Sequence, residues 1–198
     1  MKLWEKCALF GLFCAVLFSM LGFTAVCESI PDEVLRLHIL ANSDSEADQA
    51  LKLRVRDRLL EESASLMDGA STREEALAAV ETILPALREA AQDEVYRAGY
   101  SYPVTAELTE MYFPTREYED VTLPAGRYEA LRVTIGEGEG HNWWCVLFPA
   151  LCLPAAQDSA ALGDVLSAEQ LGVVEGGYEV RFKAVELYEQ LRSWMENW

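Results

Sequence analysis

The chain has 198 residues, and its 33 acidic residues outnumber its 16 lysines and arginines, so its formal net charge at pH 7 is −17. Nucleic acids and anionic lipid headgroups repel such a chain, and the sequence contains no basic patch that would offset the repulsion. We therefore expect no nucleic-acid partner. The acidity mainly favours solubility, although it also suits a basic protein surface, and the length suffices for one domain with a sizeable core.

The N-terminus has the pattern of an export signal. Lys2 and Lys6 form a short basic start, and residues 7–23 follow without a charged side chain. This order is typical of a secretory signal peptide, and the uncharged run is somewhat shorter than the roughly 20 apolar residues of a transmembrane helix. Residues 25–27 offer a small-residue cleavage site. An uncleaved signal anchor is the alternative, and a lipoprotein at Cys27 fits less well.

A strand followed by a helix is predicted next. Over residues 34–41 apolar side chains alternate with polar ones, so the apolar ones face one way while Arg36 and His38 face the other. We interpret this pattern as a strand with one buried side and one solvated side. A capping-box spacing that begins at Ser43 predicts the start of a helix, which is expected to end at residues 68–69.

A second helix has the strongest apolar periodicity in the chain. Ser71 begins another capping-box spacing, and apolar residues then recur every three or four positions as far as Val95. Pro85 lies inside this pattern and is expected to kink or divide the helix. Gly99 is expected to cap its C-terminus.

The apolar period then changes from that of a helix to that of strands. Residues 104–109 predict a strand, and an aromatic, proline-punctuated loop follows at 112–124. Two further strands are predicted over residues 128–135 and 143–148. The glycine-rich residues 136–140 between them are expected to form a flexible link or hairpin turn, because they lack the lysine and hydroxyl residue of a phosphate-binding loop.

This order of elements predicts an α+β fold with a mostly antiparallel sheet packed against helices, in a single domain after the N-terminal segment. Residues 157–177 are poorly patterned and are interpreted as a loop or a partly disordered linker, whereas residues 179–198 regain a helical period. The expected organisation is a signal peptide or anchor over 1–27, an α+β domain over 28–153, a variable linker over 154–177 and a C-terminal helix over 178–198.

The two cysteines that lie well inside the domain, Cys145 and Cys152, are the first candidates for chemistry. Outside a membrane they would suit a disulfide, and two buried free thiols are the alternative. A nucleophilic thiol would need a histidine within hydrogen-bond reach. His141 lies too far along a strand from Cys145, so only His38 could supply one. No cysteine or histidine cluster has metal-ligand spacing, and we expect no cofactor.

Two surfaces could bind a partner. One is the polar side of the first strand, and the other is aromatic, with Trp143 and Trp144 on opposite faces of the last strand. One of the two indoles can fill the core. The other must be covered by the chain itself or by a partner, since exposed tryptophan often anchors an interface.

Four of these segments carry a family resemblance. They are residues 30–45 (IPDEVLRLHILANSDS), 48–57 (DQALKLRVRD), 112–116 (YFPTR) and 142–152 (NWWCVLFPALC). With the N-terminal segment, the chain resembles the stage II sporulation protein R family of endospore-forming Firmicutes over about residues 1–153. The family typically has a second proline where Ala150 stands, and the tail after about residue 154 shows no motif that aligns.

The resemblance implies a role in signalling between two cells. Members are made in the forespore and exported into the space between forespore and mother cell. There they activate a membrane-embedded aspartic protease in the mother-cell membrane, which removes the pro-sequence of sigma-E. The resemblance therefore implies a ligand without catalytic residues or cofactor, which touches the membrane only through its N-terminal segment.

A receptor-binding surface is the hypothesis for the site. Its expected residues are Arg36, His38, Asn42, Tyr112, Phe113, Pro114, Arg116, Trp143 and Trp144. One alternative is an extracytoplasmic hydrolase that uses Cys145 or a pair of carboxylates, and another is a structural module of the cell envelope.

Overall fold

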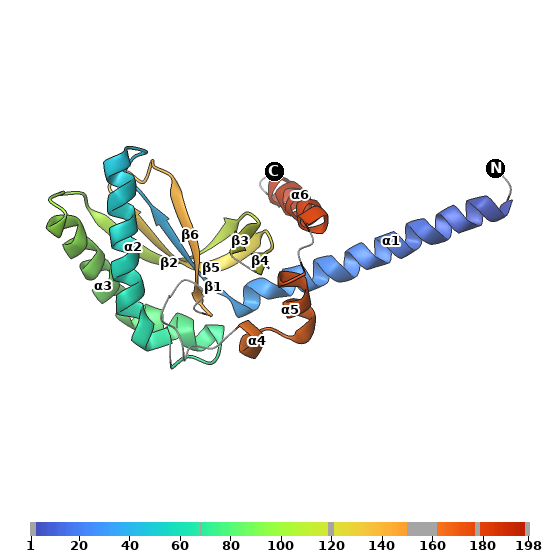
Figure 1. Ribbon diagram of the computed structural model, residues 1–198, viewed down its shortest axis with the longest axis horizontal. Coiled ribbons are helices and arrows are strands. Elements are labelled where there is room, and N and C mark those ends of the chain that lie inside the picture. Colours follow the sequence, from blue (N-terminus) through green and yellow to red (C-terminus); the bar gives the residue numbers. More distant parts are fainter. Residues whose placement is uncertain (1–2, 68, 119–120, 150–161, 177–178, 197–198) are drawn as a thin grey trace. The chain divides into compact units, whose positions relative to one another are not determined.

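A computed structural model describes residues 3–67, 69–118, 121–149, 162–176 and 179–196 (Figure 1). It combines helices with a mostly antiparallel sheet, which confirms the α+β class. In chain order the elements are α1 Leu3–Ser29, the 3-10 helix Ile30–Glu33, β1 Leu35–Leu40, α2 Glu46–Met67, α3 Arg73–Arg97, β2 Val104–Phe113, β3 Arg116–Tyr118, β4 Val121–Leu123, β5 Gly126–Ile135, β6 Asn142–Phe148, α4 Leu162–Val165, α5 Ala168–Val174 and α6 Glu179–Glu196. The chain forms two compact units, the first from residues 1–31, 112–126 and 166–198, and the second from residues 32–111 and 127–165.

A four-stranded sheet with the order β2-β5-β1-β6 forms the centre of the second unit. β1 lies between β5, to which it is parallel, and β6, to which it is antiparallel. In the β1–β6 ladder Leu37 is opposite Cys145, and His38 is opposite Trp144. Because side chains alternate along a strand, Leu37 and Cys145 share one face of the sheet while His38 and Trp144 share the other.

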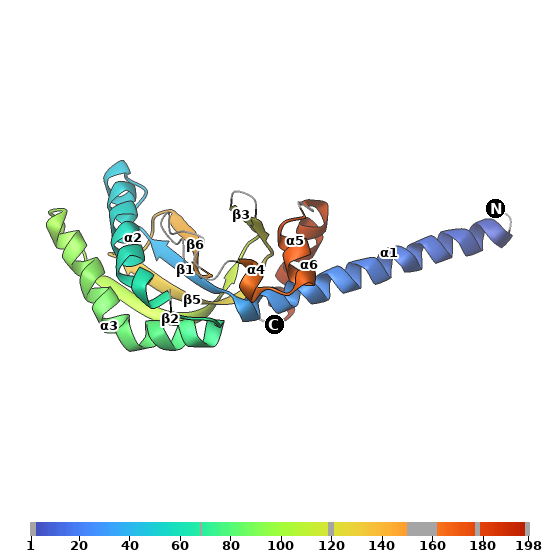
Figure 2. The same ribbon diagram turned by 60° about the horizontal axis from the view of Figure 1, so that its bottom comes forward.

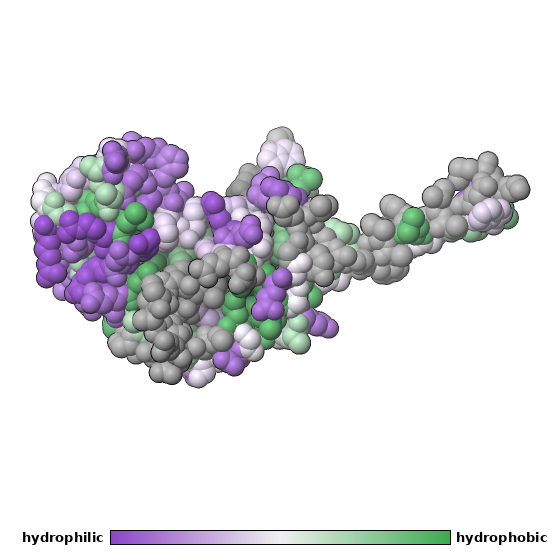
Figure 3. Space-filling view, in the orientation of Figure 1, coloured by the Kyte–Doolittle hydropathy of each residue, from purple (hydrophilic) through white to green (hydrophobic). Residues whose placement is uncertain are grey.

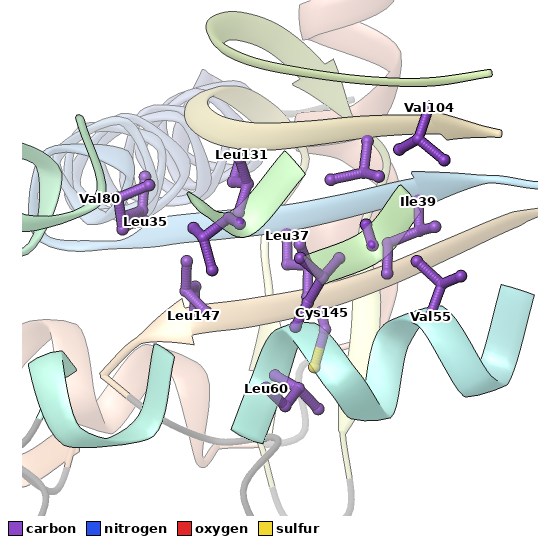
Figure 4. Packing of buried hydrophobic residues seen from close by; sticks show 14 of the residues in the cluster. Leu35, Leu37, Ile39, Val55, Leu60, Val80, Val104, Leu131, Cys145 and Leu147 are labelled. Atoms are coloured by element: carbon purple, nitrogen blue, oxygen red, sulfur yellow. The ribbon is translucent and has the colours of Figure 1, made fainter. Parts of the chain in front are cut away.

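Helices α2 and α3 pack against each other and against the first of these faces (Figures 1 and 2). The core lies between them, where Leu37, Ile39 and Cys145 of the sheet meet Val55 of α2 and Val80 of α3 (Figure 4). Each fully buried aliphatic side chain contributes on the order of 1.5–3 kcal/mol relative to an exposed one. The helical periodicity therefore predicted the correct buried side of α3.

The helix starts differ from the predicted caps by one or two residues. Helix α2 begins at Glu46, and the hydroxyl of Ser45, not of Ser43, accepts from the backbone N–H of Asp48 at 3.2 Å. Helix α3 is capped by Thr72, whose hydroxyl accepts from the N–H of Glu75. The prediction was wrong because runs of adjacent hydroxyl residues offer several capping registers, and only the path of the chain into the helix selects one.

Helix α3 runs without interruption through Pro85, so of the two expected outcomes, a kink or a division, the division is wrong. Pro85 lies on the exposed side of the helix, where the backbone carbonyl that it leaves without an N–H donor can bind water. The helix ends as predicted at Gly99, which has φ of +86° and follows the C-cap residue Ala98.

The glycine-rich residues 136–140 do not form a hairpin turn, because β5 and β6 are separated in the sheet by β1. They cross the end of β1, where the N–H of Gly140 donates to the carbonyl of Ala41 at 3.0 Å. A Cβ atom at Gly136 would overlap the side-chain amide of Asn42, and one at Gly140 would overlap the backbone of Ser43. The segment is therefore glycine-rich because it lies directly on the turn that follows β1, and it is hydrogen-bonded in place.

In the first unit, the C-terminal part of α1 packs against α5 and α6. The rings of Phe23 and Phe182 meet edge to face, with centroids 5.5 Å apart. Cys27 is buried in the same unit, and burial raises the pKa of its thiol to about 12. Among the described helices, none combines the length and the apolar character that crossing a membrane requires. The signal peptide and the signal anchor remain predictions.

Residues 162–174 contain two short helices, α4 and α5, where the sequence predicted a loop or linker. Helix α5 has a full capping box, in which the side chains of Ser167 and Gln170 each accept a hydrogen bond from the other residue's backbone N–H. Gln170 also donates to the hydroxyl of Ser29 at 3.0 Å. Helices this short lack a measurable apolar period, so only their packing reveals them. The rest of the predicted linker, residues 154–161, lies outside the described residues.

Candidate functional site

The nine residues predicted to form one surface belong to two different units. Arg36, His38, Asn42, Trp143 and Trp144 lie in the unit built around the sheet, whereas Tyr112, Phe113, Pro114 and Arg116 lie in the other.

Arg36 is not on a solvated face, as the alternation suggested, but is fully buried. Its Nε donates to the backbone carbonyl of Cys145 on β6 at 3.1 Å, and its guanidinium carbon lies 4.9 Å from the ring centroid of Tyr128 on β5. The prediction was wrong because alternation shows that two sides differ in polarity, and it does not show that the polar side meets water. Arg36 joins three strands and is a structural residue.

His38 is also buried, and its imidazole stacks on the indole of Trp144 with centroids 4.1 Å apart and an angle of 11° between the rings. Its Nε2 donates to Oδ1 of Asn142 at 2.9 Å. Burial lowers the pKa of His38, the hydrogen bond to Asn142 opposes this effect, and the positive charge of Arg132 reinforces it. The imidazole is therefore kept neutral against an aromatic neighbour.

The two tryptophans lie on opposite faces of β6, as predicted. Trp144 contacts His38, while the ring of Trp143 lies 4.4 Å from the guanidinium carbon of Arg56 on α2. Both are half-buried, and Trp143 packs against the hydrophobic core. Each indole is thus partly covered by its own unit and keeps a solvent-exposed part.

Asn42 organises the turn after β1. Its Nδ2 donates to Oδ2 of Asp48 at 2.9 Å, and its Oδ1 accepts from the backbone N–H of Glu137 at 3.1 Å. The hydroxyl of Ser43 donates to the same Asp48 oxygen at 2.6 Å. Burial raises the pKa of Asp48, but the hydrogen bonds from Ser43, Asn42, Tyr102 and Ser45 outweigh it, so the pKa lies below its ordinary value. Asn42 therefore couples the glycine-rich segment to α2.

Sequence reasoning missed a lysine that completes this network. The Nζ of Lys52 is buried and donates to the backbone carbonyl of His141 at 2.8 Å and to Oε1 of Gln49 at 2.6 Å. The backbone N–H of His141 in turn donates to Asp44 at 2.6 Å. Burial lowers the pKa of Lys52, although Asp44 opposes the shift. The only signal in the sequence was the spacing of Asp48 and Lys52, which places both on one side of α2.

In the other unit, Phe113 is fully buried and Tyr112 is half-buried, so neither forms an open aromatic surface. Burial and the nearby carboxylate of Glu186 raise the pKa of Tyr112. Pro114 and the exposed Arg116 line a cavity of about 490 Å³ together with side chains of α6. Residues 112–116 thus contribute one core residue, Phe113, and the polar side chain of Arg116 at the edge of the cavity.

No thiol–imidazole pair forms between Cys145 and His38, because the two side chains lie on opposite faces of the sheet. Cys145 is buried and takes part in a disulfide. Cys152 lies outside the described residues, so the pairing of Cys145 with Cys152 stays a prediction. Within the described part of the chain, no group of three or more histidines, cysteines and carboxylates is arranged to hold a metal ion.

Comparison with known proteins identifies one family. Residues 31–158 match the family model described as "Stage II sporulation protein R". A similar protein is "Stage II sporulation protein R" of Bacillus subtilis (strain 168), which is 41% identical over 123 residues, covering 62% of this chain and 55% of that protein. The chain therefore spans about half the length of this relative. No solved structure matches the chain.

Proposed function

Because the chain belongs to the stage II sporulation protein R family, we propose that it is an exported signal that activates a membrane-embedded aspartic protease in the neighbouring mother cell. The family's name places the protein in sporulation and denotes no enzyme. The observation that supports the proposal is the match over residues 31–158, which includes the strand of Arg36, the YFPTR segment and the tryptophan strand. The uncharged run of residues 7–23 supports export across the forespore membrane.

A protein ligand activates a receptor only if it binds the active state of the receptor more tightly than the inactive state. Buried residues such as Arg36 and Phe113 support the shape of their own units without touching a partner. Exposed and half-buried residues of the same segments are the proposed contacts, namely Pro114 and Arg116 in one unit and Trp144 in the other. A cationic Arg116 beside a cavity suits a carboxylate or carbonyl on the receptor.

The test is co-expression of the chain with the receptor protease and pro-sigma-E in a host that does not sporulate. Processing of pro-sigma-E is expected to require both this chain and its export. Arg116→Glu is expected to reduce processing at least tenfold, while the matched control Arg127→Glu leaves it unchanged. Arg127 is a good control because it is exposed, and its ion pair with Glu110 is a surface pair of small energy.

Processing that continues without the chain, or without its N-terminal segment, would contradict the proposal. If both arginine variants process normally while the parent chain remains essential, the contact surface is wrongly assigned and the signalling role stands. A purified chain that activates the protease when added from outside would distinguish a signal from a module that only scaffolds the cell envelope.

A further inference from the structure

Large exposed hydrophobic side chains concentrate on two helices of one unit. Among the described residues, all of them except Leu53 and Tyr96 lie on α1 and α6. By contrast, hydrophilic side chains gather over the region of α2 and α3 in the other unit (Figure 3). On α6 the exposed members are Leu187, Tyr188, Leu191, Trp194 and Met195. Isolated exposed leucines are ordinary in proteins, but a contiguous group of large ones marks an interaction surface.

The five exposed residues of α6 form one stripe, which we call the α6 stripe. At about 100° per residue they fall within roughly 120° of the helix circumference. Leu187 is 61% exposed, Leu191 50% and Trp194 61%. The residues by which α6 packs into its unit, Phe182 and Val185, are each 2% exposed and lie on a different side of the helix. The α6 stripe is therefore not the face that holds α6 in place.

Basic residues of α6 lie beside the α6 stripe, and acidic residues of α6 lie on the opposite side of the helix. Lys183 lies one turn before Leu187, and Arg192 lies one turn after Tyr188, so exposed cations border the stripe on both sides. Glu186 and Glu189 lie on the far side. Long basic side chains at such a border can lay their alkyl stems in an apolar medium and extend their charged ends to lipid phosphates, and tryptophan and tyrosine favour the same depth.

We propose that α6 docks on the surface of a phospholipid bilayer through the α6 stripe. The helix also packs directly on α1 through Phe182 and Phe23, and α1 exposes apolar residues of its own, including Phe10 and Leu21. Both helices, which belong to one unit, therefore expose apolar side chains that a bilayer could cover. Since the chain has a net charge of −17, the attraction comes from apolar burial, and zwitterionic phosphatidylcholine suffices as the lipid. This adds a second membrane contact to the one expected at the N-terminus, and it does not depend on the proposed receptor.

The test is flotation of the full-length chain with phosphatidylcholine vesicles. We compare the parent chain with the double variant Leu187→Glu and Leu191→Glu, and with the matched control Leu53→Glu, whose leucine is 37% exposed on α2. The partition coefficient is expected to fall at least about tenfold in the double variant and to change less than about twofold in the control. Because α1 is intact in all three chains, the difference reports on α6 alone. Circular dichroism checks that helix content is retained.

A second measurement uses vesicles with brominated acyl chains, which quench tryptophans that reach the apolar layer. Trp194→Phe is expected to remove part of the quenching, whereas Trp144→Phe leaves it unchanged. Equal partition of all variants, with quenching that does not depend on Trp194, would overturn the proposal. A concentration-dependent dimer that the double variant abolishes, with no change in vesicle partition, would also overturn it and assign the α6 stripe to self-association.

Discussion

Gly136 adopts φ of +60° where the glycine-rich segment crosses the side chain of Asn42. The positive φ alone favours glycine, since an L residue there costs on the order of 1 kcal/mol. The lack of room for a Cβ atom adds a second cost that is independent of φ. Gly99 has φ of +86° with open space around it, so the two glycines separate these effects.

We predict that Gly136→Ala lowers the free energy of unfolding by about 2–4 kcal/mol, and that Gly99→Ala lowers it by only about 1 kcal/mol. Urea denaturation of both variants measures the difference. Equal losses would show that the Asn42 side chain moves aside at no cost and that the overlap is unimportant.

His38 makes stability depend on pH through its buried ring. Its pKa is lowered in the folded state, so between that value and the ordinary pKa near 6.5 the unfolded chain binds a proton that the folded chain does not. The free energy of unfolding therefore falls as pH decreases through this window, by at most about 1.4 kcal/mol per pH unit from this group.

In His38→Phe, which keeps an aromatic ring against Trp144 but cannot titrate, the dependence between pH 7 and pH 5 is expected to be weaker. Urea denaturation across that range measures it. The control is Trp144→Phe, which keeps the His38 imidazole and an aromatic neighbour beside it and is expected to keep the steeper dependence. A His38→Phe variant with an unchanged slope would contradict the assignment.

At the scale of elements, the start of α3 illustrates how the fold selects among equivalent sequence signals. Ser71 and Thr72 are adjacent hydroxyl residues, and each has a glutamate three residues later. In the structure Thr72 caps the helix with its hydroxyl, and Glu75 accepts from the backbone N–H of Ser71. The hydroxyl of the serine is not the one that caps the helix.

We predict that Thr72→Ala lowers the free energy of unfolding by about 1 kcal/mol, whereas Ser71→Ala changes it by less than about 0.5 kcal/mol. Thermal or urea denaturation distinguishes the two, because a cap at Ser71 would give the opposite ranking. The same comparison tests whether the helix begins at Arg73, as the structure has it.

At the scale of the whole molecule, one charged side chain links the three strands β5, β1 and β6. Arg36 contacts backbone or side-chain atoms on both strands that flank β1, through the carbonyl of Cys145 and the ring of Tyr128. A charge buried in this way is stable only while its hydrogen bonds and ring contacts are kept, because the low dielectric of the interior penalises an imperfectly paired group.

Arg36→Ala is expected to lower the free energy of unfolding by about 2–4 kcal/mol, since it removes a buried hydrogen bond and leaves space between three strands. Arg116→Ala, at an exposed arginine, is expected to stay within about 0.5 kcal/mol of the parent. Denaturation midpoints of both variants provide the measurement. An unchanged free energy of unfolding for Arg36→Ala would contradict a structural role for Arg36 and would favour the solvated position that the sequence predicted.

The sequence by itself determined the local elements and the family of this protein. Alternation over residues 34–41 and the helical period before Gly99 depend only on neighbours along the chain, so they predicted β1 and the buried face of α3 correctly. The long ordered motifs also predicted the family that the comparisons identify. Such patterns survive because each element must present one apolar side to some core.

Only the tertiary structure decided which helices and strands are also covered on their second, less apolar side. Arg36 and His38 are buried because β1 is a central strand of the sheet. β1 also lies between β5 and β6, so the segment that joins them crosses the end of β1 and does not form the predicted hairpin turn. The α6 stripe, by contrast, stays exposed. The physical reason is that strand order and coverage depend on contacts between residues that are far apart in sequence. Local periodicity states which sides of an element differ in polarity, whereas long-range packing decides which of them meets water.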